Sequence, residues 1–454
     1  MAGHTRADAA RGVQLSEDAD RRGRRSIGRG GARSLAFRIL AAGAGFLTVV
    51  VTARGFGVDG RGTYALTTLA LSLMLSILGG VSHALASELA HRRASASMLL
   101  ASAITIAVFG GGVVAIVAIA IAAAFGSIYA LVFAAAALPS ALFVDYALTL
   151  LLTEGEVRRM HYLHLLKFVL PLVGLALVAA VAPGRIYVGL GAWLIAFIAV
   201  SLVAALGEWR RVGLVFRGTR ELIARLLKRG SRVSVGNGIA QLNYRIDLLV
   251  VAALLPLAEV GRYSVALALG EVLWLLSRSV MTGAYSAIMA AEASDESVRV
   301  TARAFRHSLG MLTLAAIVMG AVGSLLIVPV FGEAFAGTWL PLVLVLPGIV
   351  AFGVVEVLRE FFIVRLERVR EYLVMAGGSA VANLALAFAL IPPFGLAGAA
   401  LATSISYLGA ATYLLVRFVR ITGATDIREF VPGRTELADY QRLLRSLSGR
   451  GNGA

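Results

Sequence analysis

A stripe of polar side chains interrupts an otherwise apolar segment at residues 231–255. Residues three and four apart fall on the same face of an α-helix, so these side chains would share one face of a helix there. A charged side chain at the centre of a bilayer costs about 3 kcal/mol on insertion scales, and such residues usually face a cavity or a partner. The stripe therefore predicts a hydrated cavity in which an arginine can bind an anionic group through its planar fork. The residues of the stripe are Ser234, Asn237, Gln241, Tyr244 and Arg245.

Arg245 and Asp247 are two residues apart, so they point to nearly opposite sides of the helix and cannot pair along it. Each therefore needs a partner from another helix, or water. Glu271, in the apolar segment 261–285, would lie at about the depth of Arg245 by the helical rise and could neutralise it. The alternative for Arg245 and Asp247 is a structural role, in which they hydrogen-bond neighbouring helices together.

Two carboxylates, Glu356 and Glu360, lie one turn apart near the end of the apolar segment 340–363, with Arg359 beside them. Like charges at that spacing repel, and burial raises the free energy of the charged forms. We therefore expect these residues to bind a coupling ion or to control the inner opening of the cavity. The alternative is a cluster of interfacial salt bridges with Arg359 and Arg365, because the segment ends close by.

Three further charged residues lie inside apolar segments: Arg38, Asp145 and Arg278. Arg278 shares a helix face with Glu271, and Asp145 lies low in its segment, at a level similar to that of Glu356. Arg38 lies about one turn inside the first segment, and the alternative for it is that its side chain extends to the nearby interface. Together these charges favour the cytoplasmic half, which predicts a hydrated vestibule that opens inward.

The composition excludes most classes of soluble protein. Of the 454 residues, 59% are hydrophobic and 15% are charged, with a mean hydropathy of +0.85, whereas soluble domains carry about 25% charged residues. The chain contains no cysteine, no Gly-Lys-Ser/Thr phosphate-binding loop and no His-Glu-x-x-His metal motif. No predicted outside loop is long enough to form an ordered catalytic domain. We therefore expect a membrane protein that is not an enzyme and that has no cofactor or metal centre.

Apolar segments of about 20 residues can cross a bilayer as helices, and the chain contains twelve such segments. With a cytoplasmic N-terminus, 32 of the 42 lysines and arginines fall in cytoplasmic segments and four fall in outside loops. Because cytoplasmic loops carry an excess of basic residues, this bias predicts that both termini are inside. It also accounts for the net charge of +16 without a nucleic-acid partner. The predicted spans cover residues 34–53, 63–85, 97–125, 128–152, 162–182, 186–207, 231–255, 261–285, 307–328, 340–363, 371–391 and 396–417.

The predicted fold class is an all-α polytopic membrane protein, with about twelve transmembrane helices in two six-helix lobes. The basic N-terminal tail lacks the apolar core of a signal peptide and is expected to be disordered. Between the lobes, leucine and arginine recur in a helical pattern that suits an amphipathic helix at the membrane surface. The predicted parts are the tail 1–33, the N-lobe 34–207, the linker 208–230, the C-lobe 231–417 and a second cytoplasmic tail, 418–454.

A short motif recurs after the first and the seventh predicted spans. At an offset of 199 residues, Gly62 corresponds to Gly261 and Tyr64 to Tyr263, and an acidic residue precedes each copy. Six spans separate the copies, so both halves enter the membrane from the same side, as in a parallel repeat. The alternative is coincidence in a chain rich in alanine, glycine and leucine.

The repeated Gly-x-Tyr loop, the two lobes and the sequence RIDLLVVAALLPLAEVGRY at 245–263 resemble a known family. The family is the polysaccharide-biosynthesis flippases of the multidrug/oligosaccharidyl-lipid/polysaccharide exporter superfamily, and the resemblance covers about residues 34–417. It implies movement of undecaprenyl-diphosphate-linked glycans from the inner to the outer leaflet by alternating access of two lobes. The positions that match the family's pattern are Gly62, Tyr64, Asp247, Gly261 and Tyr263.

We therefore expect a flippase for a lipid-linked oligosaccharide in a bacterial plasma membrane. Arginine outnumbers lysine by 40 to 2, which favours a bacterium with a GC-rich genome. The expected partners are the lipid-linked glycan, membrane lipids, a polysaccharide polymerase and glycosyltransferases, with H⁺ or Na⁺ as coupling ion. The expected substrate-binding residues are Arg38, Asn237, Gln241, Arg245 and Arg278, with Arg359 as a further cation; the expected gating or ion-coupling residues are Asp145, Asp247, Glu271, Glu356, Arg359 and Glu360.

Two alternatives to this function remain. One is a cation-coupled exporter of drugs or organic cations with the same fold. Such exporters often use a carboxylate in the first-lobe cavity, whereas the first span here carries Arg38 and no acid. The other is a membrane scaffold of envelope synthesis that transports nothing, for which the buried charges would have no use.

Overall fold

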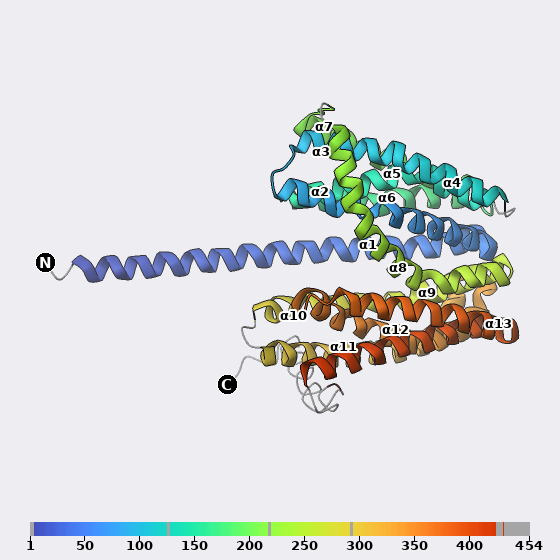
Figure 1. Ribbon diagram of the computed structural model, residues 1–454. Helices are drawn as coiled ribbons and strands as arrows, with labels where there is room; N and C mark the ends of the chain where they lie inside the picture. The colour runs from blue at the N-terminus through green and yellow to red at the C-terminus, as the bar shows by residue number, and fades with distance from the viewer. Residues whose placement is uncertain (1–3, 125–127, 217–218, 291–293, 424–429, 431–454) are drawn as a thin grey trace.

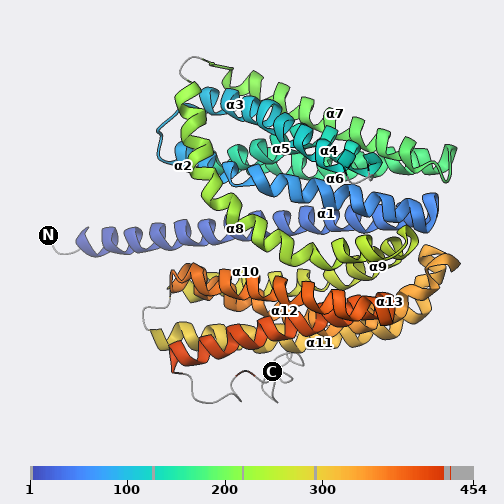
Figure 2. The ribbon, with the colours of Figure 1, turned by 45° about the vertical axis from the view of Figure 1, so that its right-hand side comes forward.

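Two bundles of helices lie side by side in the computed structural model (Figures 1 and 2). The structure describes residues 4–124, 128–216, 219–290, 294–423 and 430, and within these ranges it contains helices and no β-strand. The buried hydrophobic residues form two clusters, one for each bundle. α1, α8 and α9 lie between the bundles in both views, so these three helices form much of the contact between them.

The first bundle, called the N-lobe below, contains the helices from α1 to α7. Its short connections, such as the turn between α5 and α6, place successive helices antiparallel and next to each other. The elements are α1 (His4–Gly79), α2 (Val81–Ala90), α3 (Ala96–Thr105), the π-helical turn η1 (Ile106–Gly110), α4 (Gly111–Ala124), α5 (Ile128–Thr153), α6 (Val157–Val181) and α7 (Ile186–Val212).

The second bundle, the C-lobe, begins within α8. Leu222 and Leu226, in the first turns of α8, are fully buried in the N-lobe cluster, whereas Val250 and Val251 are buried in the C-lobe cluster. The elements are α8 (Thr219–Leu254), α9 (Leu257–Glu271), α10 (Trp274–Ala290), α11 (Ser294–Phe331), the 3₁₀ turn η2 (Glu333–Thr338), α12 (Trp339–Glu360), the π-helical turn η3 (Phe361–Arg365) and α13 (Val369–Thr422).

Two long helices reverse direction at a glycine. Gly57 in α1 and Gly395 in α13 have positive φ angles, 72° and 58°, which glycine adopts without the strain that a Cβ would cause. The reversal brings Arg61 back to the first arm of α1, where its Nη1 donates to the hydroxyl of Thr52 at 3.2 Å. Each of these helices is therefore a hairpin of two helices.

Nine helices of the described residues are long and apolar enough to cross a membrane. Two of them, Ala36–Gly79 and Val369–Thr422, contain the reversing glycines, and dividing them there gives eleven. α8 carries the polar stripe and is not among the nine. The all-α fold class is confirmed, while the number of twelve spans and the N-in, C-in topology stay predictions.

The structure continues α1 as a helix from His4, within the tail that the sequence predicts to be disordered, and the disorder stays a prediction. Low hydrophobicity limits burial of a segment but not its local hydrogen bonding. This segment has no proline and directly precedes an apolar helix, and extending a helix costs less than nucleating one. The boundaries of the lobes at residues 207 and 231 stay predictions, and most of the predicted tail 418–454 lies outside the described residues.

The sequence repeat has a counterpart in three dimensions. A Cβ added at Gly62 would lie 2.4 Å from the carbonyl oxygen of Leu257, and one added at Gly261 would lie 2.1 Å from that of Val58. Val58 corresponds to Leu257 at the same offset of 199 residues. The two copies therefore pack reciprocally, as across a two-fold axis, and we call this contact the glycine closure.

Other contacts join the lobes at the same end. Arg54 of α1 donates from Nε to the carbonyl oxygen of Val330 at 2.9 Å and from Nη2 to that of Pro329. The rings of Phe46 and Phe331 meet edge to face, with centroids 6.3 Å apart. The predicted topology places this end of the interface outside the cell.

Candidate substrate cavity between the lobes

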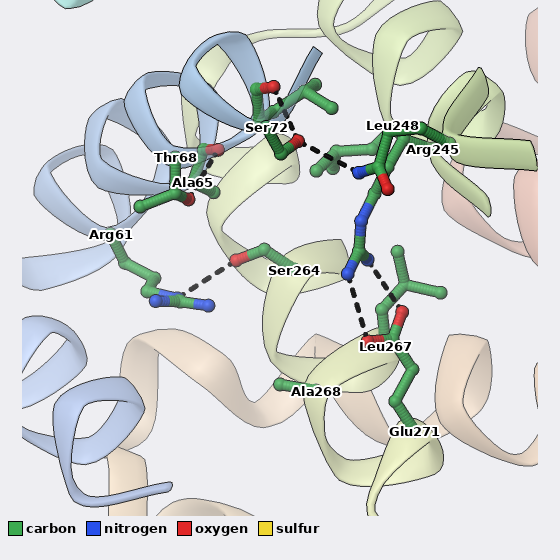
Figure 3. A pocket seen from close by; sticks show the side chains of 12 residues that line it. Arg61, Ala65, Thr68, Ser72, Arg245, Leu248, Ser264, Leu267, Ala268 and Glu271 are labelled. Carbon is green, nitrogen blue, oxygen red and sulfur yellow. Dashed lines mark hydrogen bonds and ion pairs between the residues drawn. The ribbon is translucent and has the colours of Figure 1, made fainter. Parts of the chain in front are cut away.

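A cavity of about 200 Å³ lies between the lobes, next to the glycine closure. It is formed by the second arm of α1, the middle of α8 and α9, and Figure 3 shows its side chains. Of the predicted polar stripe of α8, Gln241 and Arg245 line the cavity, whereas Ser234, Asn237 and Tyr244 do not. The lining residues are Arg61, Ala65, Thr68, Leu69, Ser72, Gln241, Arg245, Leu248, Ser264, Leu267, Ala268 and Glu271.

Arg245 and Glu271 form a bidentate ion pair at the wall of this cavity. Nη1 of Arg245 lies 2.6 Å from Oε1 of Glu271, and Nη2 lies 3.2 Å from Oε2. Glu271 is the last residue of α9, so the helix break before α10 leaves its side chain against α8. The sequence predicts Glu271 at about the depth of Arg245, and the structure brings the two side chains together. The ion pair neutralises the charge of Arg245.

Arg61 is a second cation in the cavity, and no described acid pairs with it. Its side chain is only 6% exposed, Nε donates to the hydroxyl of Ser264 at 3.0 Å, and the guanidinium lies 5.6 Å from the ring centroid of Tyr64. Nη2 makes no hydrogen bond to a described residue, and in Figure 3 the guanidinium points into the cavity. The predicted spans 34–53 and 63–85 leave Arg61 in the loop between them, but the second arm of α1 begins directly after Gly57 and contains Arg61.

The charge balance of the cavity follows from these contacts. Arg61, Arg245 and Glu271 are the ionisable residues among those that line it. Two cations and one anion leave one positive charge in the cavity. Gln241 adds neutral polarity and links the lobes, since its Nε2 donates to the hydroxyl of Ser72 at 3.0 Å.

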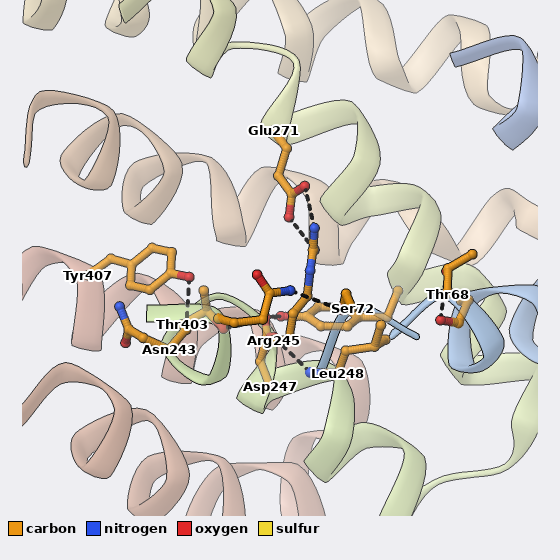
Figure 4. Close-up of polar contacts among 12 residues, drawn as sticks. Thr68, Ser72, Asn243, Arg245, Asp247, Leu248, Glu271, Thr403 and Tyr407 are labelled. Atoms are coloured by element: carbon orange, nitrogen blue, oxygen red, sulfur yellow. Dashed lines mark hydrogen bonds and ion pairs between the residues drawn. The ribbon is translucent and has the colours of Figure 1, made fainter. Parts of the chain in front are cut away.

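Asp247 lies on the other side of α8, inside the C-lobe. Only 1% of it is exposed, and its carboxylate accepts hydrogen bonds from the hydroxyls of Tyr263 at 2.8 Å and Thr403 at 3.0 Å and from the amide of Leu248 at 2.7 Å. No described lysine, arginine or histidine forms an ion pair with it. Figure 4 shows Arg245 and Asp247 leaving α8 in different directions, as the sequence predicts.

Two buried asparagines of the C-lobe have side-chain polar atoms without a hydrogen-bond partner among the described residues. Oδ1 of Asn243, one turn before Asp247 on α8, has no hydrogen bond, although the backbone carbonyl of the same residue accepts from Tyr407 at 3.3 Å. Both side-chain polar atoms of Asn383 on α13 are likewise unpaired. In the described part of the chain, no three His, Cys, Asp or Glu residues gather as a metal cluster. A cation bound here would be coordinated by one carboxylate together with hydroxyl, amide and carbonyl oxygens.

The acidic cluster of α12 does not line the cavity. Arg359 bridges both acids, at 3.1 Å from Glu356 and 2.7 Å from Glu360, and the hydroxyl of Tyr244 donates to Glu356 at 3.0 Å. Glu356 is buried, at 7% exposure, so it belongs to the C-lobe interior and not to the membrane surface. Its charge and that of Glu360 are already balanced in part by Arg359.

The remaining predicted residues lie apart from the cavity. Asp145 pairs with Lys167 at 2.5 Å in a separate N-lobe cavity of about 330 Å³. Arg38, Asn237 and Arg278 are exposed and do not line the cavity between the lobes. The structure therefore brings Gln241, Arg245 and Glu271 to one cavity, and their roles in binding or gating stay predictions. The sequence analysis did not select Arg61 and Ser264, for which the neighbouring repeat glycines were the available signal.

Comparison with known proteins identifies the fold. No protein-family model matches the chain, and no curated protein matches it. Solved structures do match, and the chain shares the fold of a lipid II flippase and of MATE transporters.

One match is the lipid II flippase MurJ in an inward closed conformation, with 15% identity over 87% of this chain and 89% of that one and a TM-score of 0.69. Another is an inward-facing multidrug resistance MATE transporter, with 16% identity over 84% of this chain and 95% of that one and a TM-score of 0.62. A third is a Vibrio cholerae MATE transporter, with 15% identity over 88% and 95% and a TM-score of 0.53. The three matched proteins are a flippase and two MATE transporters, and at 15–16% identity they establish the fold.

Proposed function

We propose that this protein is a flippase that moves an oligosaccharide from the inner to the outer leaflet while the sugar is linked to an anionic lipid diphosphate. The observation that carries the proposal is the net positive charge of the cavity between the lobes. No described acid pairs with Arg61 there, whereas Arg245 forms an ion pair with Glu271. Undecaprenyl diphosphate is the expected lipid carrier, because its diphosphate is anionic and its prenyl chain can stay in the bilayer. Arginine suits this group, since its fork donates two parallel hydrogen bonds and stays charged.

The proposed roles of the cavity residues follow from their contacts. Nη2 of Arg61 would donate to a phosphate oxygen without losing its hydrogen bonds to Ser264 and Thr52. Arg245 would exchange part of its pair with Glu271 for a second phosphate oxygen. Gln241 and Ser72 would donate to the sugar. About 200 Å³ holds only part of such a head group, so transport requires the lobes to separate around it.

We further propose that Asp247 binds the coupling ion, H⁺ or Na⁺. An ionised carboxylate buried without a basic partner is costly, and binding a proton or a cation removes that cost. Hydroxyl and amide oxygens, such as those of Thr403 and Asn243, are ligands that hard cations accept. Glu356 and Glu360 are weaker candidates because Arg359 already balances them.

The proposed setting is the bacterial plasma membrane, with glycosyltransferases and a polysaccharide polymerase acting before and after the flippase. The fold and the many apolar helices support a multi-pass membrane protein. The alternative of a drug exporter keeps one supporting observation, because MATE transporters share the fold. Its weakness is the charge of the cavity, since a net positive site repels organic cations.

Flipping of a defined substrate in proteoliposomes tests this function. Fluorescent undecaprenyl-diphosphate oligosaccharide in the outer leaflet becomes inaccessible to a membrane-impermeant quencher once it is flipped. We expect protein-dependent flipping of this lipid, no accumulation of an organic cation such as ethidium, and no flipping of the same glycan on an uncharged prenol. Ethidium transport without lipid flipping would establish the exporter instead, and inactivity with every substrate, in protein that binds none of them, would favour the scaffold.

A further inference from the structure

A second concave surface lies on the N-lobe, away from the cavity between the lobes. It is a groove of about 660 Å³ between α6 and α7, with Leu151 of α5 at its base. None of its lining residues lines the central cavity. Most of its lining residues are aliphatic, among them Leu163, Leu166 and Val203.

Cations surround one end of this groove. Arg210 lines it, is exposed, and forms no ion pair with any described residue. Arg159 also lines it and pairs only loosely, at 3.7 Å, with the partly exposed Glu156. The acid within the groove, Glu208, is buried and shares Arg211 with Glu154, and neither Arg211 nor Glu154 lines the groove. Among the charged residues that line the groove, two arginines and one glutamate therefore leave one positive charge.

An exposed aromatic residue stands at the same end. Tyr162 lines the groove with about half of its surface exposed. Tyrosine and tryptophan are enriched where helices leave the hydrocarbon core for the head-group region. The arrangement thus places an apolar channel in the hydrocarbon region and two arginines at head-group level.

We propose that this groove binds an anionic phospholipid, with an acyl chain along α6 and α7 and the phosphate between Arg159 and Arg210. Basic pockets between transmembrane helices bind anionic head groups in this way. The positive charge of Arg159 and Arg210 favours an anionic phospholipid over an uncharged prenyl chain or a neighbouring helix, because neither of these offers a phosphate that the arginines could bind. By the predicted topology the lipid belongs to the cytoplasmic leaflet. The proposal does not depend on the transported substrate.

Lipid-dependent thermal stability of the purified full-length protein tests the site. The protein in a zwitterionic detergent receives dioleoylphosphatidylglycerol or dioleoylphosphatidylcholine, and the rise in melting temperature is compared. We expect a larger rise with the anionic lipid. Arginines near a membrane surface contribute about 1 kcal/mol each, so Arg159→Gln with Arg210→Gln should weaken binding roughly 30-fold, at 1.4 kcal/mol per tenfold, and remove that extra rise.

Two further variants separate charge from shape. Arg92→Gln with Arg93→Gln removes two exposed arginines from the same lobe away from the groove, and this control should keep the response. Gly207→Leu fills the groove without changing its charge, because a Cβ at Gly207 meets nothing within 4 Å, and it should reduce the response to the anionic lipid.

The proposal would be overturned if both lipids raised the melting temperature equally, or if Arg92→Gln with Arg93→Gln lost the response as fully as the groove variants. It would also be overturned if the variants of Arg159, Arg210 and Gly207 kept the response of the wild type. An equal rise with an uncharged prenol would also overturn it, since the groove would then bind the chain alone. Elution volume on size exclusion checks that each variant is folded.

Discussion

The two parts of the lobe interface are built from different contacts. At the glycine closure, backbone meets backbone: Gly62 lies against Leu257, and Gly261 against Val58. In the adjacent cavity the lobes meet through side chains, such as Gln241 with Ser72 and Arg61 with Ser264. Water or a ligand can take over the hydrogen bonds of a polar side chain, whereas direct packing of one backbone against another is lost once the lobes separate. We therefore expect the closure to be either formed or broken, while side chains in the cavity can exchange hydrogen-bond partners with the lobes still together.

The largest expected effect comes from adding one methyl group to the closure. In Gly261→Ala, the Cβ would lie 2.1 Å from the carbonyl oxygen of Val58, which is backbone and cannot rotate away. Overpacking of this kind costs about 1–3 kcal/mol. We expect the closed end to open and transport to be abolished. Gly45→Ala on α1, where a Cβ meets nothing within 4 Å, is the matched control and should transport normally.

The absence of native cysteine allows a direct measurement of this opening. Spin labels on Asp59→Cys and Ala258→Cys, two positions that the repeat relates, report the distance across the closure. Gly261→Ala should lengthen that distance, and Gly62→Ala should do the same through the reciprocal contact. An unchanged distance with normal transport would show that the closure tolerates a side chain, and the contrast between the two regions would be lost.

The next effect concerns Arg61, whose charge no described acid neutralises. Hydrogen bonds to charged groups contribute about 1.5–3 kcal/mol, so Arg61→Gln should weaken binding of the lipid diphosphate roughly 10- to 100-fold. Arg61→Lys should recover part of this, because it keeps the charge but loses the fork. Arg185→Gln, an exposed arginine at the same end of the lobe, serves as the control. Binding to nanodisc-embedded protein measures the effect, and equal affinities for Arg61→Gln and the control would remove Arg61 from the site.

Asp247 lies on the opposite side of α8 and belongs to neither region. Asp247→Asn should therefore leave substrate affinity within about twofold, yet abolish the dependence of transport on a proton or sodium gradient. Glu356→Gln, in the cluster that Arg359 balances, should keep that dependence. Transport with and without each gradient decides between them. If Glu356→Gln alone removed the dependence, the coupling ion would belong to the α12 cluster.

The sequence predicted the class of fold, but it indicated less about which side chains lie around the cavity. Hydrophobicity and helical rise give the depth of a residue along its own helix, and depth was enough to pair Arg245 with Glu271. They do not give the rotation of one lobe against the other. Arg38, Asn237 and Arg278 have suitable types and depths but lie outside the cavity for that reason. Arg61 was missed because the reversal at Gly57 places the second arm of α1 earlier in the chain than hydropathy indicates.

The smallest expected effect concerns the Arg245–Glu271 pair, and it tests whether charge or the arginine fork sets affinity in the cavity. Glu271→Gln raises the cavity charge from one to two, and Arg245→Gln lowers it to zero; the double variant returns it to one, carried by Arg61 alone. Both side chains are partly exposed, so the pair is worth about 1 kcal/mol at most, or roughly fivefold in affinity.

If net charge sets the affinity, Glu271→Gln binds the lipid diphosphate most tightly, Arg245→Gln most weakly, and the double variant like the wild type. If the fork of Arg245 decides, the double variant binds as weakly as Arg245→Gln. Equal affinity in all four proteins would mean that the pair only joins α8 to α9, and the exchangeable contact between the lobes would then rest on Arg61, Gln241 and Ser72.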